Sequence, residues 1–123
     1  MQNDKAKFKK EFKRRLYDFV LKLIKLIESL PRDRVCFRIG DQLLRSGTSI
    51  LSNYIEGQSA SSKRDFIKYF EISLKSTNES KLWVAILRDT GKINKSDAEW
   101  FLKELEEIAN IFGSSILTLK GRK

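Results

Sequence analysis

Four polar side chains recur at helical spacing in the middle of the chain, those of Arg45, Ser49, Asn53 and Glu56. At about 100° per residue they lie within roughly an 80° arc of one helix. In solvent such a stripe contributes little, because exposed ion pairs stabilise by only ~0–1 kcal/mol. Against a second subunit each charge would need a partner, because a buried unpaired charge is costly. We interpret the residues as a subunit interface, with a structural polar stripe as the alternative.

The remaining residue types do not favour catalysis. The chain has no histidine and one cysteine, Cys36, so the commonest general base is missing and no zinc site can be assembled. Glu56 and Glu71 would be the acid–base pair of a small hydrolase, but no nucleophile or cofactor-binding motif accompanies them. We therefore predict a protein that is not an enzyme and that uses no metal, cofactor or small-molecule substrate.

Positive charge is concentrated near the start of the chain. The formal net charge is +9, and residues 1–34 carry eleven Lys and Arg against five Asp and Glu. Such an excess raises the affinity for phosphate backbones through counterion release. A solvated helix face is the alternative for the cations of the first helix. The candidate nucleic-acid-binding residues are Lys7, Lys10, Arg14, Lys22 and Lys25 in that helix, with Lys63 and Arg64 further on.

The apolar residues recur every three to four positions, which predicts an all-α protein. The expected helices cover about 7–30, 34–57, 62–90 and 95–119. Because the connections around Pro31, Ser59 and Gly91 are short, neighbouring helices should be antiparallel. We therefore predict a single domain over residues 1–123, folded as an antiparallel up-down-up-down four-helix bundle.

Glycine inside a helix costs ~1 kcal/mol relative to alanine, so helical glycines on a packing face suggest close approach of a neighbouring backbone. Gly40 and Gly47 lie two turns apart on the second expected helix, near its apolar face. The third helix has a matching row of small residues at Ser73, Thr77 and Ser80. We expect the second and third helices to pack tightly along these two rows.

Two large apolar residues of the fourth expected helix, Trp100 and Ile111, fall outside its core stripe and near glutamates. A lone exposed tryptophan is unremarkable in a soluble protein. An exposed isoleucine in addition suggests a possible subunit contact at these two positions.

The chain lacks any run of 18 apolar residues, because lysine and glutamate interrupt its most hydrophobic segment. No membrane span is therefore expected. Cys36 has the phase of Leu43 and Ile50, so it is expected to be a buried small hydrophobe. We predict a cytoplasmic protein.

Taken together, these residues resemble the bacterial four helix bundle protein family, and the resemblance spans about residues 12–119. The founding members of this family are encoded in intervening sequences of large-subunit rRNA genes, and the family often has a ribosomal-protein name. The residues that carry the resemblance are Gln42, Arg45, Ser49, Ile50, Asn53, Glu56, Ser62, Lys63, Asp65, Phe66, Ile67, Glu79, Trp83 and Leu87.

The resemblance implies a homopentameric, barrel-like ring of four-helix protomers. A relative, the accessory variability determinant of diversity-generating retroelements, uses a basic surface of such a ring to bind nucleic acid and a reverse transcriptase. The chain departs from the family at Leu51, where many members have proline, at Lys75, where they have glycine, and at Ala60, where they have a basic residue.

Two functions follow as hypotheses. The first is a ring-forming, non-enzymatic protein that binds RNA or DNA with low sequence specificity, with a reverse transcriptase as a possible partner. The alternative is a protein-interaction scaffold encoded in or near an rRNA intervening sequence.

Overall fold

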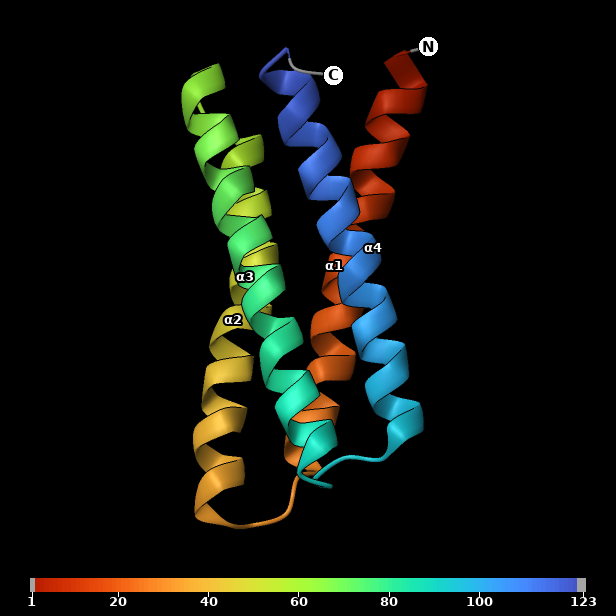
Figure 1. The fold of residues 1–123 in the computed structure, drawn as a ribbon. Helices are drawn as coiled ribbons and strands as arrows, with labels where there is room; N and C mark the ends of the chain where they lie inside the picture. Colours follow the sequence, from red (N-terminus) through yellow and green to blue (C-terminus); the bar gives the residue numbers. More distant parts are fainter. Residues whose placement is uncertain (1, 122–123) are drawn as a thin grey trace.

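The computed structural model describes residues 2–121 as an antiparallel four-helix bundle, which confirms the predicted fold class (Figure 1). The helices are α1 (Gln2–Glu28), α2 (Arg34–Gln58), α3 (Lys63–Asp89) and α4 (Lys95–Leu119). Both termini and the α2–α3 connection lie at one end of the bundle, while the α1–α2 and α3–α4 connections lie at the other. The described helices include none with an apolar stretch long enough to cross a membrane.

Each of the last three helices begins at a side chain that accepts a hydrogen bond from a backbone N–H of its first turn. The carboxylate of Asp33 accepts from Cys36 N at 2.8 Å, and Ser62 Oγ accepts from Asp65 N at 3.1 Å. The amide oxygen of Asn94 accepts from Asp97 N at 2.7 Å. These caps satisfy donors that have no partner within the helix, and therefore define where each helix starts.

The C-terminus of α3 is fixed by a glycine. Gly91 has a φ of 70°, a left-handed conformation that side chains other than glycine rarely adopt. Gly91 N donates to Arg88 O at 3.0 Å and Lys92 N donates to Leu87 O at 2.9 Å. Both bonds satisfy the last carbonyls of the helix.

A cluster of aromatic rings fills the core near the end that carries the termini. Phe112 of α4 contacts Phe12 of α1 with ring centroids 5.4 Å apart, and Phe70 of α3 at 5.2 Å. Tyr54 of α2 packs its ring 5.1 Å from Phe12. Because Phe112 is fully buried among rings from the other three helices, this cluster joins all four helices.

Gly40 and Gly47 of α2 face α1, so our expectation that they face α3 was wrong. A Cβ added to Gly47 would lie 2.1 Å from Leu23 Cδ2, and one added to Gly40 would lie 3.4 Å from Ile27 Cγ2. The glycines therefore let α1 approach α2.

The predicted row of small residues on α3 does meet α2, but it meets other residues of that helix. Ser46 Oγ and Ser80 Oγ lie 2.8 Å apart, and Ser73 Oγ donates to Ile50 O at 3.0 Å. Ser46, Ser73, Thr77 and Ser80 are fully buried. We call this contact the small-residue seam.

Candidate nucleic-acid interface and subunit surfaces

The polar stripe on α2 finds its main partners on α3. The guanidinium of Arg45 forms an ion pair with Glu79 and donates to Gln42 Oε1 at 2.9 Å. Glu79 also accepts from Trp83 Nε1 at 3.0 Å. The Arg45 side chain is still 56% exposed. The charge is therefore paired within its own chain, and one side of it stays open to solvent.

Two further members of the stripe form one hydrogen-bonded group with α3. Ser49 Oγ accepts from Asn53 Nδ2 at 2.9 Å and from Ser76 Oγ at 2.8 Å. Glu56 is exposed and makes no ion pair with any described residue. Arg45, Ser49 and Asn53 therefore need no second subunit to satisfy their polar atoms, whereas Glu56 faces solvent.

The five candidate cations of α1 differ in their surroundings. Lys7 and Arg14 pair with Glu11 and Asp18 of their own helix, at 4.0 and 3.2 Å. The ammonium of Lys22 lies 4.3 Å from the centre of the Trp100 ring. In the described part of the chain, Lys10 and Lys25 make no ion pair.

Lys7 and Lys10 share the end of the bundle that carries the termini with Lys63 and Arg64, in the first turn of α3 (Figure 1). We call this the basic end and define it as residues 2–13, 56–71 and 114–121. It carries nine Lys and Arg against five Asp and Glu. Lys63, Arg64, Lys68 and Lys120 line a hollow of about 550 Å³ there, together with Glu71. Lys120 pairs with Glu71 at 2.9 Å, so the other three cations stay available.

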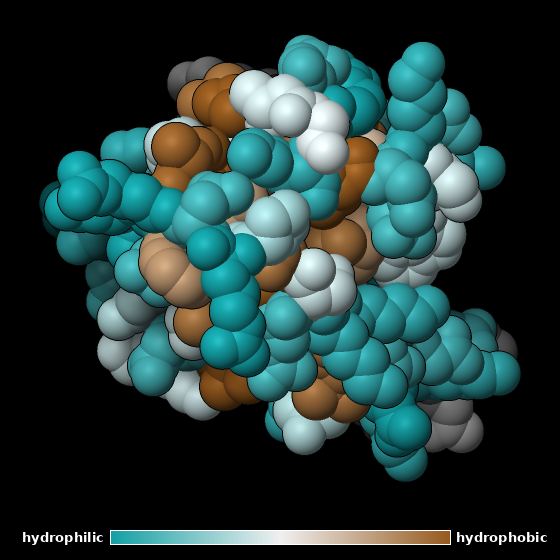
Figure 2. Space-filling view, turned by 90° about the horizontal axis from the view of Figure 1, so that it is seen from below, coloured by the Kyte–Doolittle hydropathy of each residue, from teal (hydrophilic) through white to brown (hydrophobic). Residues whose placement is uncertain are grey.

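The opposite end, residues 25–41 and 85–99, is close to charge balance. It carries seven Lys and Arg against six Asp and Glu. Two of its cations are neutralised locally, since Arg88 pairs with Asp89 at 2.8 Å and Lys92 pairs with Asp33 at 3.1 Å. Figure 2 shows this end covered mainly by hydrophilic side chains, with hydrophobic residues visible between them.

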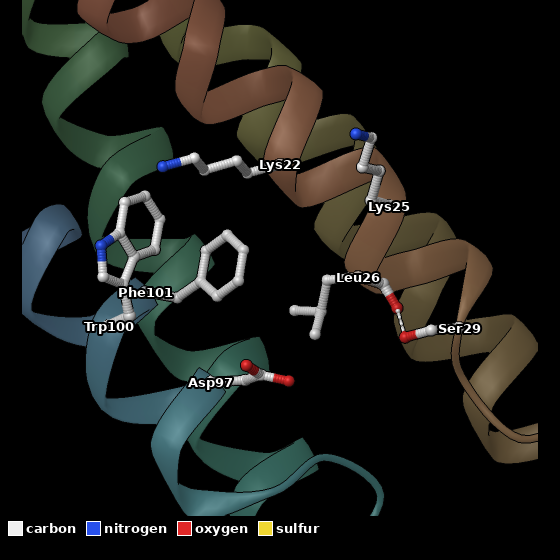
Figure 3. Close-up of a pocket in the computed structure, with 7 residues that line it drawn as sticks. All are labelled: Lys22, Lys25, Leu26, Ser29, Asp97, Trp100 and Phe101. Carbon is white, nitrogen blue, oxygen red and sulfur yellow. Dashed lines mark hydrogen bonds between the residues drawn. The ribbon is translucent and has the colours of Figure 1, made fainter.

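Arg14, Lys22 and Lys25 line a surface groove between α1 and α4, which we call the α1–α4 groove. Two cavities lie in this groove, and Lys22 and Trp100 line both of them. The cavity nearer the α1–α2 and α3–α4 connections measures about 400 Å³ (Figure 3). Within residues 2–121 no Cα atom of α1 lies within 8 Å of a Cα atom of α4. Long side chains therefore bridge the two helices here.

Arg15 makes the strongest polar contact across the groove. This residue was not among the site residues predicted from the sequence. Its guanidinium donates to Glu104 at 2.7 and 2.8 Å and to Glu107 at 3.1 Å. Hydrogen bonding to Glu104 is the main cause that raises the pKa of Arg15 above its usual range. Its position between the buried residues Phe12 and Leu16 was the available signal, because a cation there can reach the neighbouring helix.

Trp100 and Ile111 do not form one exposed patch. Trp100 is 41% exposed and lies in the α1–α4 groove with its ring against Lys22 and Phe101. Ile111 is half-buried and packs against the hydrophobic core, so our expectation of an exposed isoleucine was wrong. The position lies at the edge of the core stripe, where helical phase alone does not decide exposure.

A different set of large apolar side chains is exposed on α1 and α2. We call this set the α1–α2 apolar face, and it consists of Tyr17, Leu21, Phe37, Leu44 and Ile55. Phe37 is the most exposed member, at 60%. Phe37, Leu44 and Ile55 lie on one side of α2, since their spacings of seven and eleven residues correspond to whole helical turns. That spacing was the signal from which the face could have been predicted.

The fold and these surfaces define a basic, antiparallel four-helix bundle. Residues 9–114 match the family model described as 23S rRNA-intervening sequence protein, and the chain belongs to that family. Among solved structures, it is similar to a Bacteroides thetaiotaomicron protein of unknown function from the S23 ribosomal protein family. The two chains are 33% identical with a TM-score of 0.80, over 85% of this chain and 96% of the other. A comparison with curated proteins finds no match.

Proposed function

We propose that this protein is a cytoplasmic, non-enzymatic oligomer that binds nucleic acid through its basic end with low sequence specificity. The observation that carries the proposal is the charge difference between the two ends. The basic end carries nine Lys and Arg and five Asp and Glu, whereas the opposite end carries seven Lys and Arg and six Asp and Glu. Phosphate backbones are attracted to such a local excess.

The cations at the basic end suit phosphate contacts better than base recognition. Lys5, Lys9, Lys10, Lys63 and Arg64 are exposed, and none of them makes an ion pair with a described residue. Long, mobile lysines attract phosphates as point charges and carry no information about base sequence. Low sequence specificity and strong salt dependence follow from this arrangement.

The direct test is the affinity for a labelled RNA or DNA strand at two salt concentrations. Between about 50 and 200 mM salt, binding that depends on several phosphate contacts should weaken by at least about tenfold. Absence of binding at the lower salt concentration would contradict the proposal.

The α1–α2 apolar face supports assembly of several copies. Five large apolar side chains are exposed there, and large apolar patches commonly mark protein contacts. The family resemblance suggests a ring of five copies. Replacing Phe37 with lysine should lower the mass measured by light scattering. The matched control is Leu117→Lys on α4, where the side chain is 46% exposed. An unchanged mass for Phe37→Lys would exclude this face as the subunit contact.

The same apolar face supports the second candidate function, a scaffold that binds another protein such as a reverse transcriptase. A pull-down before and after nuclease treatment separates the two functions. A partner held through nucleic acid should be lost on nuclease treatment, whereas a partner held by the apolar face should be retained and then released by Phe37→Lys.

A further inference from the structure

A cleft of about 390 Å³ opens at the basic end and is lined by residues of all four helices. We call it the end cleft. Its volume lies in the range of small-molecule pockets, about 300–1,000 Å³. Aromatic rings from three helices contribute to its walls: Phe8 and Phe12 of α1, Tyr54 of α2, and Phe66 and Phe70 of α3. A flat aromatic group therefore matches the chemistry of the cleft.

One ring at the mouth of the cleft has a free face. Phe8 stacks on Phe12 with centroids 5.9 Å apart and 15° between the ring planes, yet Phe8 is 54% exposed. Phe12 is held from behind by Tyr54 and Phe112, with centroids at 5.1 and 5.4 Å. Phe8 is thus supported by a buried ring while about half of its own surface stays accessible, which suits a stacking platform.

The polar groups of the end cleft favour a ligand that carries negative charge. Lys5 and Lys9 lie one helical turn apart in its lining, and neither makes an ion pair with a described residue. None of the described residues that line it carries a carboxylate. Gln58 and Thr118 add an amide and a hydroxyl group that can donate and accept hydrogen bonds.

The α1–α4 groove offers an aromatic ring too, but its surroundings differ. The ammonium of Lys22 already lies over Trp100, and the carboxylate of Asp97 lines the cavity beside it (Figure 3). The carboxylate of Glu104 lines the second cavity of the groove. An anionic ligand would have to displace the cation and approach these carboxylates. The end cleft is therefore the better site for a ring attached to a phosphate.

We propose that the end cleft receives an unstacked base of a single-stranded nucleic acid, which stacks on Phe8 while Lys5 and Lys9 hold the neighbouring phosphates. This inference rests on the proposed function and adds to it the class of nucleic acid. Bases of a duplex are stacked on one another and cannot enter such a cleft, whereas an aromatic platform accepts any free base. The protein should therefore prefer single strands.

The test measures fluorescence anisotropy with a labelled single strand of about twelve nucleotides, an abasic strand of equal charge and a duplex. Phe8→Ala should weaken binding of the single strand by about tenfold and leave binding of the abasic strand and the duplex unchanged, since stacking on an aromatic side chain is lost. Phe8→Trp should restore the affinity. Trp100→Ala, the matched control in the α1–α4 groove, should leave all three affinities unchanged.

The outcomes distinguish the inference from the proposed function. Equal affinity of the unaltered protein for the single strand and the abasic strand would overturn the base-binding cleft and leave phosphate binding in place. A free mononucleotide that competes as well as the strand would reassign the cleft to a small ligand and overturn the inference too. Failure of the unaltered protein to bind any of the three would overturn both.

Discussion

The small-residue seam and the α1–α4 groove both hold antiparallel helices together, but with side chains of opposite size. In the seam, short hydroxyl side chains let α2 and α3 approach closely, and buried Ser46 and Ser80 bond to each other. In the groove, Arg15 and the ring pair Phe19–Phe101, with centroids 5.7 Å apart, bridge helices whose Cα atoms stay more than 8 Å apart within the described residues.

The two contacts should differ in how well they tolerate a larger side chain. A seam of small side chains has no room for additional atoms, because protein interiors are close-packed. A contact made by long side chains leaves hollows beside them, and residues of both α1 and α4 line the α1–α4 groove and the end cleft. The end cleft, which we propose as the site of an unstacked base, follows from that difference.

The largest expected effect is that of Phe112→Ala. Phe112 joins rings from the other three helices, so its loss leaves a cavity and should lower the free energy of unfolding by about 4 kcal/mol. Urea denaturation measures this change. Phe8→Ala, which removes a half-exposed ring of the same type, should cost less than about 1 kcal/mol. Similar losses for the two variants would mean that Phe112 does not join the four helices.

The same substitution should have different effects on the two sides. Ser73→Leu places a large side chain at a fully buried position of the small-residue seam and should cost about 3 kcal/mol by overpacking. Ser115→Leu places it in the lining of the end cleft, where there is space, and should change the free energy of unfolding by less than about 1 kcal/mol. An equal effect at the two positions would remove the distinction between the closely packed small-residue seam and the open end cleft.

The ion pair across the groove should stabilise the fold more than an ion pair between two residues of one helix. A double-mutant cycle with Arg15→Met and Glu104→Gln should give a coupling energy of about 1 kcal/mol, because the Glu104 side chain is only 16% exposed. The same cycle for Arg14 and Asp18, with side chains 78% and 51% exposed, should give close to zero. A larger coupling for the exposed pair would contradict the bridging role of Arg15.

The smallest expected effect is a pH dependence at the opposite end, where Asp33 links the two connections. The hydrogen bond from Cys36 N, followed by that from Lys92, holds the pKa of Asp33 below its usual value. Its stabilising contribution is therefore present at neutral pH and is lost as the pH falls below about 4, through the folded-state pKa.

Thermal unfolding at pH 7 and pH 2.5 measures this contribution. Asp33→Asn keeps a capping oxygen but removes the titrating group, so the difference in melting temperature from the unaltered protein should be larger at pH 7 than at pH 2.5. A difference that does not change with pH would exclude a role for the Asp33 charge.

Much of the fold could be predicted from the sequence because its signals are local. Apolar residues at helical spacing predicted the four helices, and the short stretches around Pro31, Ser59 and Gly91 predicted their connections. The neighbours of the glycines could not be predicted in this way. Gly47 and Ser46 are adjacent in sequence and face α1 and α3 respectively. Which side of α2 contacts which helix depends on the order of the helices around the bundle. The helical spacing of apolar residues does not determine that order.

The candidate surfaces were predictable only in part for a related reason. The sequence identifies Lys7, Lys10, Lys63 and Arg64 as cations, but only the fold brings the starts of α1 and α3 to one end. Likewise, Lys22 has the sequence pattern of a solvated lysine, and its contact with Trp100 depends on the separation of two helices. The sequence therefore predicted the charges, whereas their grouping required the tertiary structure.

The most direct test of the account compares two triple variants that remove the same charge from opposite ends of the bundle. The first replaces Lys10, Lys63 and Arg64 with alanine, and the second replaces Arg32, Arg34 and Lys95, which are also exposed. The affinity for a labelled single strand at low salt should fall by at least about tenfold for the first variant and less than about threefold for the second. Equal losses would mean that net charge alone attracts nucleic acid and would contradict an interface at the basic end.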